Sequence, residues 1–408
     1  MRVGLEHEYV VRRDGETIDF RALIHHLGLE GEALDPGDHY AHRMPGGVVI
    51  TCDDREAEVS TPPVPLGSDF VVDLDAWVAA ATGSLVSRCA GLELEGCSTH
   101  FSVSAAESGA VRAAGLMART FAPALMLMMD NTTSDGLLVR PRYERIEVGG
   151  DFVTGPGCRS TALMAAGAVL TCLAVARRER PKSHLPPAVR VEIVPAQGRY
   201  GWYIDRRAFG PDLYERGRAA VLRRELWGRI SAQDHLEAAW RIARRELLRV
   251  GVVDGLDEVD EIVAGRAPLP CEEPPDRHPP ASGRPPSVDS LARAAAPIAR
   301  PGLRLVPVAA TWDYVVWEAS VGGLVAVPVA ELGEFLDRVR GGLLDEELRA
   351  GLAGATRELV TFWDAVAGGF FAAVADDANL ATPERVADGT LALTPRSPIV
   401  GRRSAGVG

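Results

Sequence analysis

The sequence predicts an α+β protein with a larger N-terminal domain and a small C-terminal domain. Short stretches in which apolar and polar residues alternate, as in half-buried strands, dominate roughly the first hundred residues. Longer apolar segments with helical spacing follow them. A segment dense in proline, residues 268–301, then interrupts the pattern before further strands and helices begin.

The alternating segments of the N-terminal part are expected as strands over 3–11, 48–52, 56–61 and 99–104, with further strands at 142–148 and 188–194. Helices are expected over 73–89, over 106–130 with an interruption at Pro123, over 160–178, and over 231–250. Ser231 and Asp234 have the spacing of a helix N-terminal cap, which marks the start of the last of these helices.

Beyond the Pro-rich segment, strands are expected within 303–319 and 324–330, and helices within 331–352 and 356–374. The expected domains are therefore a catalytic domain over 1–265, a flexible or extended linker over 266–302 and a small domain over 303–395. A disordered tail is expected over 396–408.

Composition excludes several classes of function. The net charge of -12 disfavours general binding of nucleic acid or of an anionic membrane. The chain opens without the pattern of a secretory signal, and its apolar run near 161–176 is expected as a core helix. The six cysteines include no CxxC pair, so free thiols and a cytoplasmic location are expected.

Strand periodicity places polar side chains on shared faces, because residues two apart on a strand point the same way. The pairs are Glu6 with Glu8, Glu56 with Glu58, His100 with Ser102, and Arg145 with Glu147. A single such strand is explained by a solvated outer face. If all four line one concave sheet, the carboxylates repel one another, and a divalent ion is the natural compensation. Oxygen ligands with one imidazole suit Mg²⁺ or Mn²⁺ better than zinc.

Five motifs, in order along residues 1–175, resemble those of the glutamate–cysteine ligase family. They are GLEHEY, EAEVSTPP, THFSVS, APALMLMMDN and RPRYERIEVGGD, and the last is also similar to the RIEV strand of glutamine synthetase. The resemblance implies a curved, mainly antiparallel sheet flanked by helices, as in the catalytic domains of glutamine synthetase and the guanidino kinases.

The resemblance also implies a site. Its metal ligands are Glu6, Glu8, Glu58, His100 and Glu147, with Asp53 or Asp54 as a further acidic ligand; Glu56 has no family counterpart. A structural role for His100 is the alternative. The family usually has Arg where this chain has Gly149, so Arg140, Arg142 or Arg145 is expected to supply the charge that meets the phosphoryl group.

The implied activity is amide formation that depends on ATP and on Mg²⁺ or Mn²⁺ and proceeds through an acyl phosphate. Glutamate or a related acid is the expected carboxylate, and the amine belongs to a small molecule, a peptide or a carrier protein. The rivals are a phosphotransferase like the guanidino kinases and a non-catalytic binding protein. A faint similarity of residues 331–342 and the amphipathic helix after them to peptide-clamping winged-helix domains leaves a lid, an oligomerisation domain or a peptide clamp open for the C-terminal part.

Overall fold

The computed structural model describes residues 1–281, 283 and 298–352, with short gaps, and three later strands. The gaps are 30–31, 36–37, 45, 106, 143, 194, 199–200, 227, 311, 313, 321–323 and 329–331. The chain forms two compact units: unit 1 holds Met1–Leu23 and Cys52–Pro286, and unit 2 holds Ile24–Thr51 and Ser287–Gly408. Residues 266–286 of the expected linker thus cluster with unit 1, where Pro270–Glu272 forms a 3₁₀ turn.

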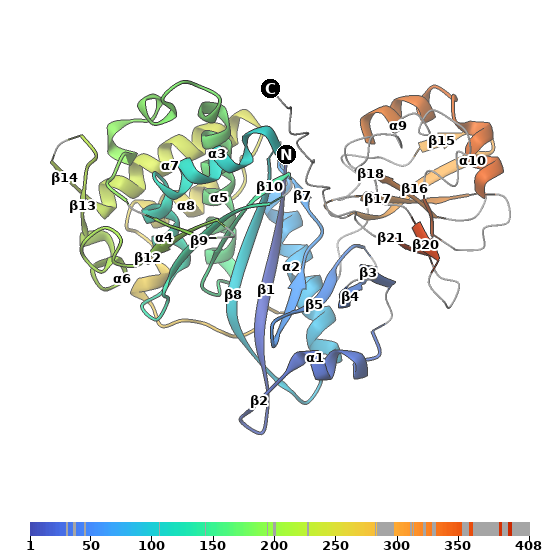
Figure 1. The fold of residues 1–408 in the computed structure, drawn as a ribbon, viewed down its shortest axis with the longest axis horizontal. Helices are drawn as coiled ribbons and strands as arrows, with labels where there is room; N and C mark the ends of the chain where they lie inside the picture. The colour runs from blue at the N-terminus through green and yellow to red at the C-terminus, as the bar shows by residue number, and fades with distance from the viewer. Residues whose placement is uncertain are drawn as a thin grey trace, which may run out of the picture. The chain divides into compact units, whose positions relative to one another are not determined.

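Unit 1 is built around an antiparallel sheet whose two longest strands, β1 and β8, lie side by side (Figure 1). Its strand order is β11-β12-β9-β10-β8-β1-β6, and β2 and β7 also pair with β1. The strands are β1 (Arg2–Arg13), β2 (Glu16–Ile18), β6 (Glu56–Ser60), β7 (Val64–Pro65), β8 (Glu93–Ser104), β9 (Gly136–Arg142), β10 (Arg145–Gly150), β11 (Ala196–Gly198) and β12 (Gly201–Asp205). The predicted α+β class, with a large antiparallel sheet flanked by helices, is confirmed at this level.

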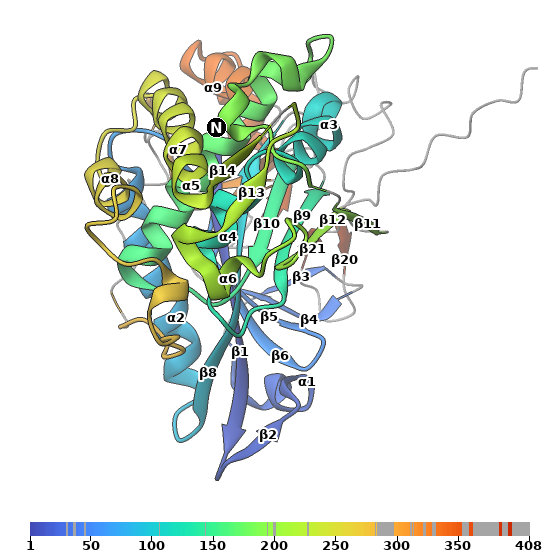
Figure 2. The ribbon, with the colours of Figure 1, turned by 90° about the vertical axis from the view of Figure 1, so that its left-hand side faces the viewer.

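One face of the sheet is apolar and is covered by helices (Figure 2). Leu5, Phe101, Val148 and Val139 form a row across β1, β8, β10 and β9, and all four are buried. The helices of unit 1 are α1 (Phe20–Leu23), α2 (Phe70–Arg88), α3 (Glu107–Ala118), α4 (Ala122–Met129), α5 (Gly155–Ala176), α6 (Leu213–Arg216), α7 (Ala232–Arg249) and α8 (Leu256–Val263). Burial of this face leaves the other face of β1, β8 and β10 to polar side chains.

Helices α2 and α5 are long and apolar enough to cross a membrane by length and composition alone. In unit 1, 56% of the apolar window of α2 and 72% of that of α5 is buried inside the protein. Both pack within unit 1, and α5 lies against α7.

The N-terminal cap predicted for α7 is confirmed: Ser231 Oγ accepts a hydrogen bond from the Asp234 amide at 3.0 Å. The strand expected over 188–194 is wrong. There the chain forms the 3₁₀ turn η3 (Pro187–Val189) and then a single bridge between Val191 and Arg224. Pro187 is the first residue of the 3₁₀ turn, a position that proline favours, so the chain begins there as a turn and not as a strand.

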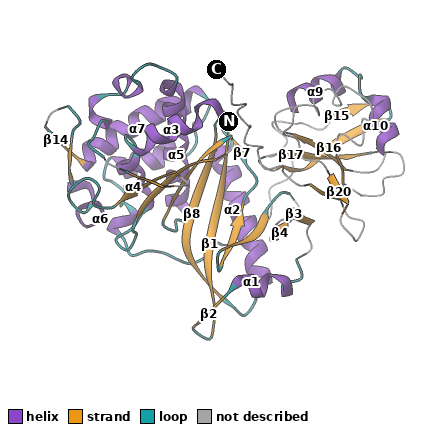
Figure 3. Ribbon diagram, viewed as in Figure 1, coloured by secondary structure: helices purple, strands orange, loops and turns teal. Residues whose placement is uncertain are grey.

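Unit 2 contains a second sheet of order β15-β16-β17-β18-β19, with helices α9 and α10 (Figure 3). Its elements are β3 (Glu32–Asp35), β4 (Asp38–Arg43), β5 (Val49–Asp53), which ends in unit 1, β15 (Ile298–Arg300), β16 (Leu303–Ala310), β17 (Tyr314–Ala319), β18 (Leu324–Pro328), α9 (Leu332–Arg340), α10 (Asp345–Leu352), β19 (Leu359–Thr361), β20 (Pro383–Arg385) and β21 (Leu391–Leu393). Trp317 and Phe335 pack with ring centroids 5.9 Å apart in its core.

One expectation for the C-terminal part needs correction. Within the helix expected over 356–374, Leu359–Thr361 is instead strand β19, which pairs in parallel with β18. The run Leu359, Val360, Thr361 ends in two β-branched residues, which favour an extended backbone beside an existing strand. The rest of that helix and the tail over 396–408 lie outside the described residues.

Candidate active site

The register of the central strands brings the predicted acidic residues together. On the polar face, Glu6 of β1 lies opposite His100 of β8 and opposite Ser60 of β6. Glu8, two residues further along β1, lies opposite Glu58. Glu147 of β10 lies opposite Ser102, one row away from His100. These side chains therefore share one face because the pairing keeps the two-residue period in phase across four strands.

His100 is the centre of this cluster. Its Nδ1 lies 3.6 Å from Glu6 Oε2, 3.7 Å from Glu8 Oε1 and 3.4 Å from Glu147 Oε1. One imidazole N–H cannot satisfy three carboxylates at such distances. The convergence of three acids on one nitrogen is what an intervening cation would relieve.

The ligand atoms divide into two groups, Glu6–His100–Glu147 and Glu8–Asp53–Glu58, and within each group they all lie within 4.8 Å of one another. Mg²⁺ holds oxygen ligands at about 2.1 Å, so donors on opposite sides of one ion lie about 4.2 Å apart. Small side-chain adjustments would therefore let each group hold an ion. Glu8 Oε1 and Glu147 Oε2 are buried and accept no hydrogen bond among the described residues, so both have lone pairs available to a metal ion. The donor set fits a hard divalent ion.

The electrostatics of the cluster reflect crowded negative charge. Burial and the charges of Glu6 and Glu8 raise the pKa of Glu58 to about 8. Burial alone would lower the pKa of His100, but the surrounding carboxylates, Glu6 first, raise it to about 9. Burial also raises the pKa of Glu8. Without metal, bound protons supply the neutralising charge.

The structure distinguishes two acids between which the sequence left a choice. Asp53 belongs to the group of Glu8 and Glu58, whereas Asp54 turns away at φ 47° and pairs with Arg21 at 3.4 Å. Glu56 belongs to neither group, and its Oε2 accepts a hydrogen bond from the Arg55 amide at 3.1 Å.

Two serines that the sequence analysis did not select also touch the acids. Ser60 Oγ donates to Glu58 Oε1 at 3.0 Å, and Ser98 Oγ donates to Glu8 Oε2. Each lies two residues from a selected side chain, Glu58 or His100, on the same strand. The two-residue period was therefore the signal that could have identified them.

The three predicted arginines approach the cluster from β9 and β10. Arg140 Nη2 donates to Glu147 Oε1, and Arg142 Nε lies 3.3 Å from Glu147 Oε2. Arg145 lies opposite Arg142 and Ser104, and its charge helps to lower the pKa of Glu6, which burial alone would raise. Glu147 therefore joins the acidic groups to a cationic edge suited to a phosphate.

Gly149 lies opposite His100 and makes room for it. A Cβ at position 149 would lie 2.7 Å from His100 Cδ2 and 2.9 Å from His100 Nε2. No side chain fits there unless the imidazole moves. The imidazole of His100 thus fills the space beside position 149, where the family resemblance implies Arg. The cationic side chains next to Glu147 are those of Arg140 and Arg142.

A buried polar network that the sequence analysis missed adjoins β10. Asp130 Oδ1 accepts from the Asp151 amide at 2.9 Å, and Asp130 Oδ2 accepts from the Tyr214 hydroxyl. Burial raises the pKa of Asp130 to about 7. Asp151 in turn accepts from Asn131 and pairs with Arg277 at 3.1 Å. The network ties the strand end after Gly149 to helix α4 and to residues of the Pro-rich segment.

No family model matches the chain, and no curated protein matches it. Among solved structures, the chain is similar to the crystal structure of the complex between the prokaryotic ubiquitin-like protein Pup and its ligase PafA, with 11% sequence identity and a TM-score of 0.37. The match covers 65% of this chain and 64% of that chain. This chain therefore spans less than two thirds of the length of the chain that it matches.

Proposed function

We propose that this protein is an ATP-dependent carboxylate–amine ligase that forms an amide through an acyl phosphate. One observation carries the proposal. Carboxylates and an imidazole from strands β1, β5, β6, β8 and β10 converge on one sheet face in two groups with the spacing of ion ligands. A solvated surface would not bury Glu147 completely or hold three acids around one imidazole nitrogen.

Each part of the cluster has a role in the proposed chemistry. The groups of Glu6, His100 and Glu147 and of Glu8, Asp53 and Glu58 would hold Mg²⁺ or Mn²⁺, which neutralises phosphate charge when bound. Arg140 and Arg142, beside Glu147, would stabilise the phosphoryl group in transfer.

The proposed reaction has two steps. A substrate carboxylate oxygen attacks the γ-phosphorus of ATP and releases ADP. The amine nitrogen then attacks the acyl carbon, the bond to the phosphate oxygen breaks, and the amine loses a proton. Activation is needed because a carboxylate is unreactive toward amines at neutral pH. Glutamate or a related acid is the proposed donor, and the acceptor amine belongs to a small molecule, a peptide or a carrier protein.

The test is a panel of amino acids and amines incubated with ATP and Mg²⁺, in which released phosphate and new products are measured by colorimetry and mass spectrometry. A ligase gives phosphate and an amide in equal amounts for one carboxylate–amine pair. A phosphorylated substrate without free phosphate would instead identify a phosphotransferase. Folded protein that releases no phosphate across the panel would contradict the proposal.

Two glutamates on β6 give a matched pair of variants. Glu58→Gln removes a proposed ion ligand and is expected to lower turnover by at least about 10²-fold. Glu56→Gln changes the same chemistry on the same strand outside both groups and is expected to retain turnover. Equal turnover in the two variants would rule out the proposed assignment of ligands.

A further inference from the structure

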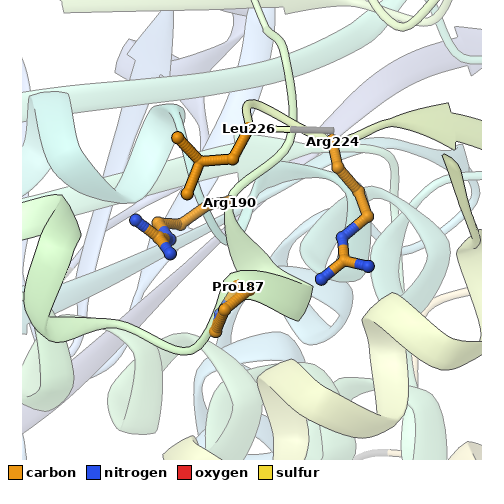
Figure 4. A pocket seen from close by; sticks show the side chains of 4 residues that line it. All are labelled: Pro187, Arg190, Arg224 and Leu226. Atoms are coloured by element: carbon orange, nitrogen blue, oxygen red, sulfur yellow. The ribbon is translucent and has the colours of Figure 1, made fainter. Parts of the chain in front are cut away.

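Outside the acidic cluster, a short backbone ladder of unit 1 carries several arginines. Val191 and Arg224 form an antiparallel bridge, the Glu225 amide donates to Arg190 O at 2.9 Å, and the Glu192 amide donates to Arg223 O at 2.9 Å. The backbones of Arg190 and Arg224 are therefore fixed side by side. Their side chains, with Pro187 and Leu226, line a pocket of about 160 Å³ (Figure 4).

These two guanidinium groups lack counterions. Within the described part of the chain, neither Arg190 nor Arg224 forms an ion pair with a carboxylate, and Arg190 Nε is buried without a hydrogen-bond partner. Two nearby acids are engaged elsewhere: Glu225 pairs with Lys182 at 3.0 Å, and Asp234 accepts from Ser231 Oγ at 2.7 Å. Two cations held at one pocket without a partner favour a bound anion.

The pocket also has an apolar part. Leu226 has 54% of its surface exposed, and Pro187 lies across the opening from it (Figure 4). The volume of about 160 Å³ is enough for a carboxylate or phosphate with a short apolar group. Arg224 also lines a second pocket of about 400 Å³.

We propose that the pocket between Arg190 and Arg224 binds a small oxyanion, a carboxylate or a phosphate, whose apolar part rests on Leu226. The two guanidinium forks hold the oxygens, and the leucine selects ligands with an aliphatic group. This site uses none of the residues of the acidic cluster, so the proposal does not depend on the ligase activity.

The test is residue-resolved labelling of arginines with phenylglyoxal, followed by peptide mass mapping of the whole protein. Inorganic phosphate and isovalerate are the probes, compared with sodium chloride at equal ionic strength. We expect labelling of Arg190 and Arg224 to slow at least fivefold, while the neighbouring exposed Arg223 is unaffected. Protection by phosphate alone or by isovalerate alone identifies the oxyanion. Absence of protection by both probes, or equal protection of Arg223, would overturn the proposal.

Two variants sharpen the test. Arg224→Gln should abolish protection of Arg190, because one site needs both forks, whereas the control Arg223→Gln should preserve it. Leu226→Ser, at an exposed position, should weaken protection by isovalerate at least threefold and leave protection by phosphate unchanged. Full protection of Arg190 in Arg224→Gln would show that the two arginines do not share a ligand.

Discussion

At the scale of single residues, Gly149 and His100 depend on each other. The imidazole fills the space that any side chain at position 149 would need, since the nearest ring atom lies 2.7 Å from an ideal Cβ there. In Gly149→Ala, His100 must rotate or withdraw from the three carboxylates around its Nδ1. We expect turnover to fall by about 10²-fold, the loss typical of a 1 Å misplacement in an active site. Phosphate release under saturating ATP measures it.

The matched control is Gly157→Ala. Gly157 lies in the first turns of α5, where a Cβ would meet no atom within 4 Å. Helix propensity predicts unchanged or slightly higher stability for this variant, by up to about 1 kcal/mol. If Gly149→Ala retained the turnover of Gly157→Ala, the position of His100 would not matter to the chemistry.

Asp130 gives a prediction about pH. Burial raises the pKa of this carboxyl from 3.8 to about 7. Between these values the native state keeps a proton that the unfolded chain has lost, so Asp130 makes the protein less stable as pH rises from 3.8 to 7. Asp130→Asn removes this dependence. The unfolding free energy of the wild type should fall relative to the variant by up to about 1.4 kcal/mol per pH unit.

Urea unfolding of both proteins at several pH values tests this. Tyr214→Phe provides a second check, because the Tyr214 hydroxyl lowers the pKa of Asp130. Its removal should move the affected pH range upward. Parallel pH profiles of the wild type and Asp130→Asn would contradict a raised pKa.

Sequence alternation predicted which side chains share a face but not which of two adjacent acids joins the cluster. Glu6, Glu8, Glu58, His100 and Glu147 were selected because side chains on a strand alternate and the motifs resemble a known family. Asp53 and not Asp54 joins the cluster because the backbone at Asp54 is left-handed, with φ 47°. The sequence of this turn does not specify that conformation.

At the scale of elements, the pairing of β1 with β8 shows what periodicity misses. Glu8 lies opposite Ser98 and Tyr9 lies opposite Gly96, so Cys97 is an extra residue on β8. Such a bulge bends a strand and changes the aim of neighbouring side chains. A bulge belongs to a pair of strands, and neither strand alone reveals it. Among its described residues, the segment 188–194, wrongly expected as a strand, forms a single bridge, to the distant Arg224, and the sequence of the segment alone does not reveal this pairing.

The composition of the Pro-rich segment, residues 268–301, did not indicate the contacts that Arg277 makes. The Arg277 carbonyl accepts from the Gly96 amide at 2.7 Å, and its guanidinium pairs with the buried Asp151. Arg277→Gln should therefore cost about 2 kcal/mol, the range for a hydrogen bond to a charged, buried partner. It should also speed hydrogen exchange at the Gly96 amide.

Arg266→Gln is the control for this variant. Arg266 pairs with Glu261 at 2.8 Å, but both side chains are more than half exposed, so the variant should leave the free energy of unfolding nearly unchanged. Urea unfolding and hydrogen exchange measured on both proteins decide the matter. Equal costs for the two variants would mean that Arg277 does not anchor the segment.

At the scale of the whole molecule, both groups of candidate ligands belong to unit 1, together with Arg140, Arg142 and Arg145. The resemblance covered residues 1–175, and the structure concentrates the candidate site in that part of the chain. Unit 2 has its own sheet and its own core around Trp317, which no motif could connect to the site.

This division predicts how a metal ion acts on the molecule. An ion that binds only the native state stabilises it by about 2.7 kcal/mol at a concentration 100-fold above its Kd. Because the ligands lie in unit 1, Mn²⁺ should slow hydrogen exchange in β1 and β8 and leave exchange in β16 and β17 of unit 2 unchanged. In Glu58→Gln the effect on β1 and β8 should shrink, and in Glu56→Gln it should persist. Equal slowing in β16 and β17 would mean that the ion stabilises the protein without binding the acidic cluster. Unchanged exchange in β1 would mean that the acidic cluster does not bind Mn²⁺.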